Sequence, residues 1–162
     1  MSSVTIWSWR LIVSRGHSDE KPQTWFRYGE AMSSEVHNVL AALSTISDPW
    51  QPHRLTSIND YDVKVVKLHG EFVWHTHPET DELFLVLSGE LTIQLRDRDV
   101  VLGPQDIFVV PKGIEHCPKA ENEVQALLFE PQGTINTGDV GGEMTSPLRE
   151  LGDGGDDQSD RA

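Results

Sequence analysis

The sequence is poor in cysteine, in basic residues and in long apolar runs. Its 162 residues include one cysteine, so an intrachain disulfide is excluded, which fits a reducing compartment. The net charge of -13, from 13 basic and 26 acidic residues, argues against binding to nucleic acid or to an anionic membrane surface. No apolar run approaches the roughly 18 residues of a membrane span. Arg10 and Arg15 flank too short an apolar segment for a signal peptide, so we expect a cytoplasmic protein.

Three histidines and one glutamate form the most informative pattern. His75 and His77 are two residues apart, so on a strand both side chains point to the same face. The polar link 78–81 lets the chain turn back, which brings Glu82 beside them, and His116 comes from a later strand. Three imidazoles and one carboxylate suit iron, manganese, nickel, zinc or copper. We therefore predict one divalent transition metal ion at this site and leave its identity open.

The sequence shows no residue pattern for a nucleophilic catalytic site or for a phosphate-binding site. With these histidines assigned to a metal, no Ser-His-Asp or Cys-His arrangement competes. Phosphate recognition would need a glycine-rich helix N-terminus or an arginine cluster, and neither is evident. Cys117 adjoins His116 but should point to the opposite face of the strand, as a small buried side chain. The other histidines are interpreted as ordinary core or surface residues: His17, His37, His53 and His69.

The sequences around the four candidate ligands resemble the two motifs of the cupin superfamily. Residues 70–89 resemble the first motif and residues 103–116 the second, and the resemblance covers about residues 55–137. It implies a small jelly-roll barrel with a metal near one mouth and His75, His77, Glu82 and His116 as ligands. Two departures leave these ligands intact. The first motif is one residue shorter than usual before His75, and Ala120 stands where asparagine is common.

Within this superfamily the chain is similar to single-domain cupins of type 2 labelled mannose-6-phosphate isomerase-like. The similarity lies in residues 59–68 and 130–139. The label concerns sequence similarity and does not establish a sugar phosphate as substrate.

The expected fold is all-β, a small double-stranded β-helix (jelly-roll) barrel with an N-terminal helix and a disordered acidic C-terminal tail. We divide the chain into a poorly defined N-terminal extension (1–32), a helix and linker packing on the barrel (33–57), the cupin barrel (58–138) and the disordered acidic tail (139–162). All the motifs and predicted elements follow Met32, so a further hypothesis is that translation of the native protein begins at Met32.

Apolar periodicity locates the helix and the strands. Helical spacing runs from Val36 to Ile46, with Ser34 as N-cap and Asp48-Pro49 as the end. Short segments rich in β-branched or aromatic residues predict strands at 63–68, 72–77, 82–87, 91–95, 100–102, 106–110 and 124–130. Residues 83–87 are apolar on both faces, which predicts a homodimer with sheet-to-sheet contact or cover from the N-terminal helix.

Two functions fit these features. The first is a small metalloenzyme of isomerase, lyase or dioxygenase type that acts on a small organic substrate. Glu71 or Glu115 would be its acid/base, unless each is an ordinary solvated carboxylate. The second is a non-catalytic small-molecule binding or sensing module. Four aromatic residues would then line an apolar barrel mouth, unless they are plain core: Phe72, Trp74, Phe84 and Phe108.

Overall fold

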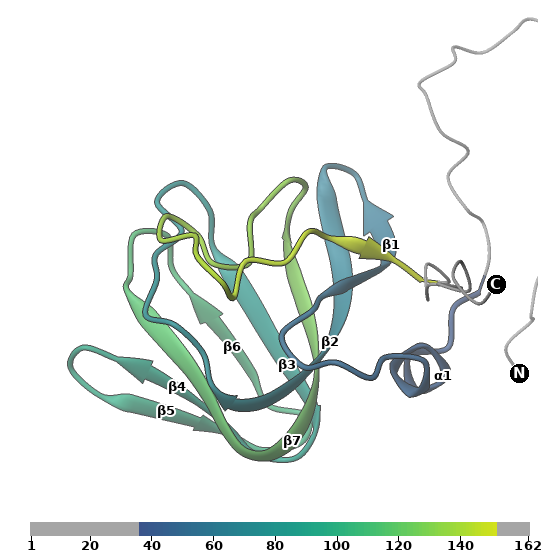
Figure 1. The fold of residues 1–162 in the computed structure, drawn as a ribbon, viewed down its shortest axis with the longest axis horizontal. Helices are drawn as coiled ribbons and strands as arrows, with labels where there is room; N and C mark the ends of the chain where they lie inside the picture. Colours follow the sequence, from purple (N-terminus) through teal and green to yellow (C-terminus); the bar gives the residue numbers. More distant parts are fainter. Residues whose placement is uncertain (1–35, 152–162) are drawn as a thin grey trace, which may run out of the picture. The chain divides into compact units, whose positions relative to one another are not determined.

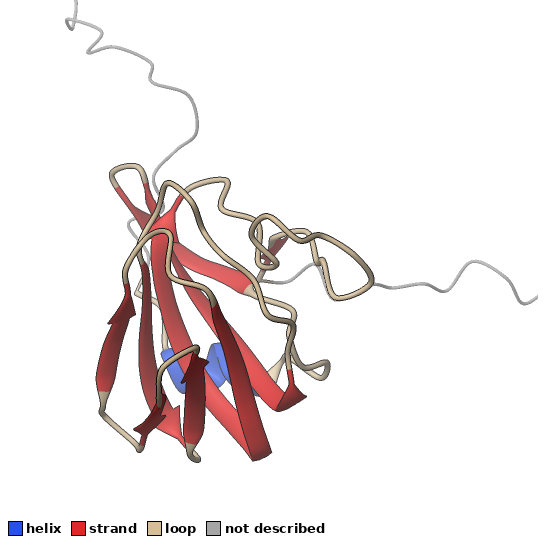
Figure 2. Cartoon of the chain, turned by 90° about the vertical axis from the view of Figure 1, so that its left-hand side faces the viewer, coloured by secondary structure: helices blue, strands red, loops and turns tan. Residues whose placement is uncertain are grey.

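The computed structural model describes residues 36–151, which are mostly strand with one short helix (Figure 2). The prediction for residues 1–32 lies outside this range. The elements in chain order are α1 (Val39–Ser44), β1 (His53–Ile58), β2 (Tyr61–Glu71), β3 (Glu82–Ser88), β4 (Leu91–Leu95), β5 (Asp99–Leu102), β6 (Ile107–Val110), β7 (His116–Pro131) and β8 (Arg149–Glu150). The predicted all-β barrel is confirmed. The described part of the chain contains no helix with the length and apolar character that a membrane crossing requires.

The long strand β7 organises the barrel. Its first residues pair antiparallel with β4, its central and final residues pair with β2, and residues 125–129 also pair with β3. Two layers therefore share one curved strand, drawn in green in Figure 1. One layer continues from β4 to β5, and the other continues through β2 to β1 and through β3 to β6. This arrangement brings residues 116–119 close to residues 71–75, which are far from them in sequence.

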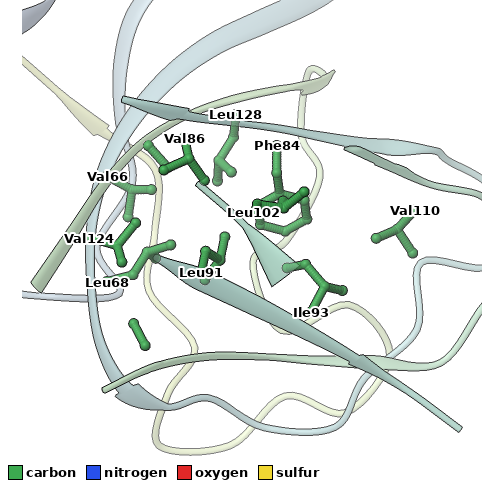
Figure 3. Close-up of a cluster of buried hydrophobic side chains, with 12 residues drawn as sticks. Val66, Leu68, Phe84, Val86, Leu91, Ile93, Leu102, Val110, Val124 and Leu128 are labelled. Carbon is green, nitrogen blue, oxygen red and sulfur yellow. The ribbon is translucent and has the colours of Figure 1, made fainter. Parts of the chain in front are cut away.

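Alternating residues of these strands fill the space between the layers. Valine, leucine, isoleucine and phenylalanine side chains from β2 to β7 converge in this space (Figure 3). Val86, Leu91, Ile93 and Val124 are completely buried. The period of two gives each strand one face for this core and one for the outside. Packing of this core fixes the pairing register of the strands. The register in turn determines which other side chains point into the barrel interior.

The helix is shorter than predicted and begins later. Asn38 is the N-cap, and its Oδ1 accepts a hydrogen bond from the backbone N–H of Ala41 at 2.9 Å. Leu43 and Ile46 are buried, as the periodicity predicted. Val36 is 99% exposed and lies before the helix, and the predicted cap Ser34 is outside the described residues. Local capping by Asn38 therefore sets the start, while Leu43 packs with Leu55, Val63 and Val65 on the outer face of the barrel.

The strands differ from the prediction mainly in four places. Residues 72–77 form no regular strand, because only His75 makes a bridge there, with His116. Strand β2, predicted to end at residue 68, instead continues to Glu71. Residues 53–57 were predicted as linker but belong to β1, whose mixed side chains give weak alternation. Strand β7 begins well before the predicted residue 124. Pairing with β2 and β4 extends these strands beyond their local sequence signals.

The predicted disordered tail begins too early at residue 139. Asp139 hydrogen bonds to Thr76, and β8 pairs in parallel with β1. Leu151 packs against the cluster that α1 covers. Glycine and acidic composition indicated disorder, but backbone and side-chain hydrogen bonds to the barrel hold residues 139–151. The remaining tail, 152–162, lies outside the described residues.

Gly89 gives a test of this packing. Its φ is +84°, and a Cβ atom there would lie 2.8 Å from the carbonyl oxygen of Glu123 and 2.9 Å from Cγ2 of Val124. We expect Gly89→Ala to lower the free energy of unfolding by about 3 kcal/mol, because strain and overpacking add. Chemical denaturation measures this. Gly70→Ala is the matched control, because Gly70 has a φ of +81° with nothing within 4 Å of the added Cβ. An equal loss in both variants would show that the contact with β7 is unimportant.

Candidate metal centre

The barrel brings together the four residues that the sequence singled out. His116 opens β7, Glu82 opens β3, and His75 and His77 lie in the connection between β2 and β3. All four side chains are buried, and their candidate ligand atoms lie within 4.8 Å of one another. Backbone hydrogen bonds position them: His75 and His116 exchange both N–H···O bonds at 3.0 Å, and the Gly113 N–H donates to the His77 carbonyl at 2.9 Å.

The backbone also orients two of the imidazole rings. Nδ1 of His75 lies 2.9 Å from the Val73 carbonyl oxygen, and Nδ1 of His116 lies 3.0 Å from that of Ile114. A carbonyl oxygen only accepts, so Nδ1 carries the proton in both rings. The Nε2 lone pair of each neutral ring is then free for a metal, as in metal-bound histidines whose other nitrogen is hydrogen bonded.

The remaining contacts in the centre leave acceptors without donors. Nε2 of His116 lies 3.1 Å from Oε2 of Glu82, so in the neutral ring two acceptors face each other. Nε2 of His77 is buried without a hydrogen-bond partner, 3.4 Å from the same oxygen. An unpartnered buried nitrogen is costly and needs a cause. A cation among these atoms would satisfy them, so the residues present fit a bound metal ion.

At His75 and Glu82, electrostatics favours the protonation state that a metal requires. Burial, followed by the charge of His116, lowers the pKa of His75 to about 4. Burial alone would raise the pKa of Glu82, but the adjacent His116 and His77 rings lower it to about 2. Burial also disfavours the charged form of His77, yet the nearby Glu82 carboxylate more than offsets this and raises the pKa of His77. At neutral pH the centre therefore offers an ionised carboxylate and a neutral His75.

Comparison with known proteins identifies the family. A family model described as a cupin domain matches residues 63–130. The uncharacterized protein YdbB of Bacillus subtilis (strain 168) is 37% identical over 84 residues, which cover 51% of this chain and 74% of the relative. The chain belongs to the cupin superfamily. A crystal structure of a cupin-2 domain containing protein from Shewanella frigidimarina is 40% identical, covers 63% of this chain and 100% of its own, and has a TM-score of 0.60.

A more distant neighbour shows how widely the fold is shared. The hydroquinone 1,2-dioxygenase PnpCD, solved with Cd²⁺ and 4-hydroxybenzonitrile, is 18% identical with a TM-score of 0.53. The alignment covers 70% of this chain and 83% of that chain. At this identity the similarity is one of fold alone.

A cavity of about 30 Å³ lies beside the metal candidates in this cupin barrel. Phe72 and Phe84 line it, as predicted. The other two predicted aromatics lie elsewhere: Trp74 stacks under the Arg96 guanidinium at 3.7 Å, and Phe108 packs against the main core. The complete lining is Trp50, Pro52, Val66, Leu68, Phe72, His75, Glu82, Phe84, Pro118, Leu128 and Asn136.

Sequence analysis missed Trp50 and Asn136 in this lining, because both lie outside the cupin motifs. Trp50 has a φ of +62°, stacks on Phe72 with ring centroids 4.7 Å apart, and donates its Nε1–H to the His69 carbonyl. The Asn136 amide bonds to the backbone of Met144 and Ser146. Apart from the metal candidates, the lining polar side chains are thus already engaged, and the walls are essentially apolar.

A buried ion pair in the barrel interior was also missed. Nζ of Lys64 lies 2.6 Å from Oε1 of Glu130, and both side chains are at most 2% exposed. Burial and then the charge of Glu82 raise the pKa of Glu130 to about 7, while Lys64 opposes the shift. Strand periodicity could have indicated this pair. Lys64 is two residues from Val66, and Glu130 is two residues from Leu128, so each charged residue shares a strand face with a core residue.

Glu71 and Glu115, the two candidate acid/base residues, fit better as ordinary solvated carboxylates. The Arg96 guanidinium donates two hydrogen bonds of 2.7 Å to Glu115, and these bonds lower the pKa of this exposed carboxyl. Glu71 is exposed at the end of β2, opposite Lys119. Cys117 is buried beside the Phe72 carbonyl and outside the metal cluster, as predicted.

Proposed function

We propose that this cupin binds one divalent transition metal ion through His75, His77, Glu82 and His116, as a small metalloenzyme of isomerase, lyase or dioxygenase type. The observation that carries the proposal is the convergence of four buried ligand atoms, among them a His77 nitrogen with no partner. A bound ion of this kind would supply Lewis-acid chemistry, by polarising a substrate oxygen or lowering the pKa of a bound water. Iron, manganese, nickel, zinc and copper all accept this donor set.

The chain's own residues have separable roles in this proposal. Glu82 contributes the negative charge that offsets the transfer of a cation into a buried site. His75 and Glu82 also line the cavity, so a ligand held there would lie directly beside the centre. The apolar walls exclude water, which strengthens electrostatic interactions in the cavity. The lining therefore favours a small organic substrate with an apolar body and an oxygen donor directed at the centre.

The alternative function is a non-catalytic small-molecule binding or sensing module. The apolar and aromatic walls of the cavity support it. At about 30 Å³ the cavity has room for roughly two water molecules, so an organic ligand would have to widen it in either function. The likeness to mannose-6-phosphate isomerase-like cupins stays a prediction from sequence. So do the cytoplasmic location and the absence of nucleic-acid and membrane partners.

The homodimer is likewise a proposal. Ile107 and Val109 of β6 are 60% and 41% exposed on the outer side of the barrel. Among the described strands, β6 pairs only with β3 and leaves its other edge open. An open edge with apolar side chains is suited to pairing with a second copy.

Access of a small ligand to the metal distinguishes the two functions. We expect Co²⁺-loaded protein to change its visible absorption when azide is added, because an enzyme of this type keeps a coordination position open. Spectrophotometric titration measures the change, and azide added to Co²⁺ with His75→Ala/His77→Ala protein is the control. A wild-type spectrum that azide leaves unchanged would indicate a closed shell and would favour the binding or sensing module.

A further inference from the structure

The segment that carries two of the metal candidates is held from both sides. His75 directs its N–H and C=O toward His116 of β7. Thr76 directs its own groups elsewhere: its N–H donates to Oδ1 of Asp139 at 2.9 Å, and its carbonyl accepts from the Asp139 N–H at 3.1 Å. Asp139 therefore engages both backbone polar groups of the residue between His75 and His77.

Gly138 allows this close approach. Its φ is +54°, and a Cβ atom at this position would lie 2.1 Å from the Thr76 carbonyl oxygen and 3.3 Å from Cδ2 of His75. Backbone cannot yield to a contact of 2.1 Å, so any side chain here would push the two segments apart. Gly138 therefore lies directly against the Thr76 backbone and the His75 ring, and Asp139 lies against the Thr76 backbone.

These two residues belong to a segment with its own anchors. We call residues 132–148 the strap; it leads from the end of β7 to β8 beside β1 and is drawn in yellow-green in Figure 1. Inside it, Asn136 bonds to the backbone of Met144 and Ser146, both at 3.0 Å, and the hydroxyls of Thr137 and Thr145 lie 2.7 Å apart. The strap can therefore act as a fixed support for Thr76.

We propose that Asp139 is a positioning residue of the metal centre: it holds Thr76 so that the imidazoles of His75 and His77 reach one ion together. The proposal rests on the proposed function, since it presumes that the centre binds a metal. The rings of His75 and His116 are already oriented through Nδ1, so the loss of Asp139 should act mainly through His77, which follows Thr76 directly. Supports of this kind set metal affinity although they do not touch the ion.

The test compares three variants with the wild type: Asp139→Ala, Asp139→Asn and Asp106→Ala. The amide introduced by Asp139→Asn retains an Oδ1 acceptor. Asp106 is the matched control, because its Oδ2 accepts a backbone N–H bond of 2.8 Å from Gly103 at a turn that supplies none of the candidate ligands. The readouts are Co²⁺ affinity by competition with a chelator, the visible spectrum of the Co²⁺ protein, and the melting temperature of the metal-free protein.

We expect Asp139→Ala to weaken Co²⁺ binding about tenfold and to shift the Co²⁺ spectrum. Asp139→Asn should recover most of the affinity, and Asp106→Ala should bind as the wild type does. Wild-type affinity and spectrum in Asp139→Ala would overturn the positioning role, and so would an equal loss of affinity in Asp106→Ala. If the wild type binds no Co²⁺, the proposed function itself fails and the positioning role fails with it.

Discussion

Protein carrying His75→Ala and His77→Ala should gain no thermal stability from a divalent transition metal. For the wild type, metal at about 1,000 times its dissociation constant stabilises the fold by about 4 kcal/mol. In a protein of this size, that corresponds to a rise in melting temperature on the order of 10 °C. The double variant loses two of the four buried donors that converge in the centre, so calorimetry with and without Zn²⁺, Mn²⁺ or Ni²⁺ should show no shift.

His53→Ala is the control for this experiment. Nδ1 of His53 lies 2.9 Å from the Gln51 carbonyl, the same arrangement that orients His75 and His116, but His53 is outside the cluster. This variant should keep the full metal-dependent shift. A shift of wild-type size in the His75→Ala/His77→Ala protein would place the metal elsewhere and would contradict the proposed centre.

Replacing Lys64 with methionine should destabilise the metal-free protein by about 3–5 kcal/mol above neutral pH. The change leaves the buried Glu130 carboxylate without its cation, 2.6 Å away in the wild type. Urea denaturation in the presence of a chelator measures the loss. Lys64→Met/Glu130→Leu removes both charges and should recover most of the stability, because apolar replacement of a buried pair is often neutral or stabilising.

The loss should depend on pH in a defined direction. The pKa of Glu130 is raised in the fold from 4.5 to about 7, so the stability from this group is fully present below pH 4.5 and is lost as pH rises through 7. Lys64 holds this pKa down, so its removal moves the window upward and deepens the loss. The Lys64→Met protein should therefore differ little from the wild type at about pH 5 and most at about pH 9. A loss of equal size at both pH values would contradict the buried-carboxylate explanation.

The candidate centre was predictable because its information is local. His75, His77 and Glu82 lie in one short motif that resembles a cupin motif. Strand periodicity does not account for their convergence, because residues 72–77 form no regular strand. The partner His116 followed from the second motif. The strands were located by β-branched and aromatic runs, although β7 begins earlier because long-range pairing with β4 and β2 stabilises residues that have weak local preference.

The surroundings of the centre were less predictable, because they depend on contacts distant in sequence. Glycine and acidic composition suggested a tail from residue 139, whereas Asp139 bonds to Thr76 across 63 positions. Glu115 was a candidate acid/base until its bonds to Arg96, 19 positions away, were located. Trp50 enters the cavity wall with an unusual positive φ that no local signal indicated.

Metal content of untagged protein, measured by inductively coupled plasma mass spectrometry beside the His75→Ala/His77→Ala variant, tests the central claim most directly. We expect about one transition metal ion per chain in the wild type and none in the variant, because the ligand atoms of both histidines belong to the buried cluster. The metal found would then separate oxygen chemistry, for iron, from Lewis-acid chemistry, for zinc, nickel or manganese. Wild-type protein that folds without metal and takes none up when it is supplied would contradict the account.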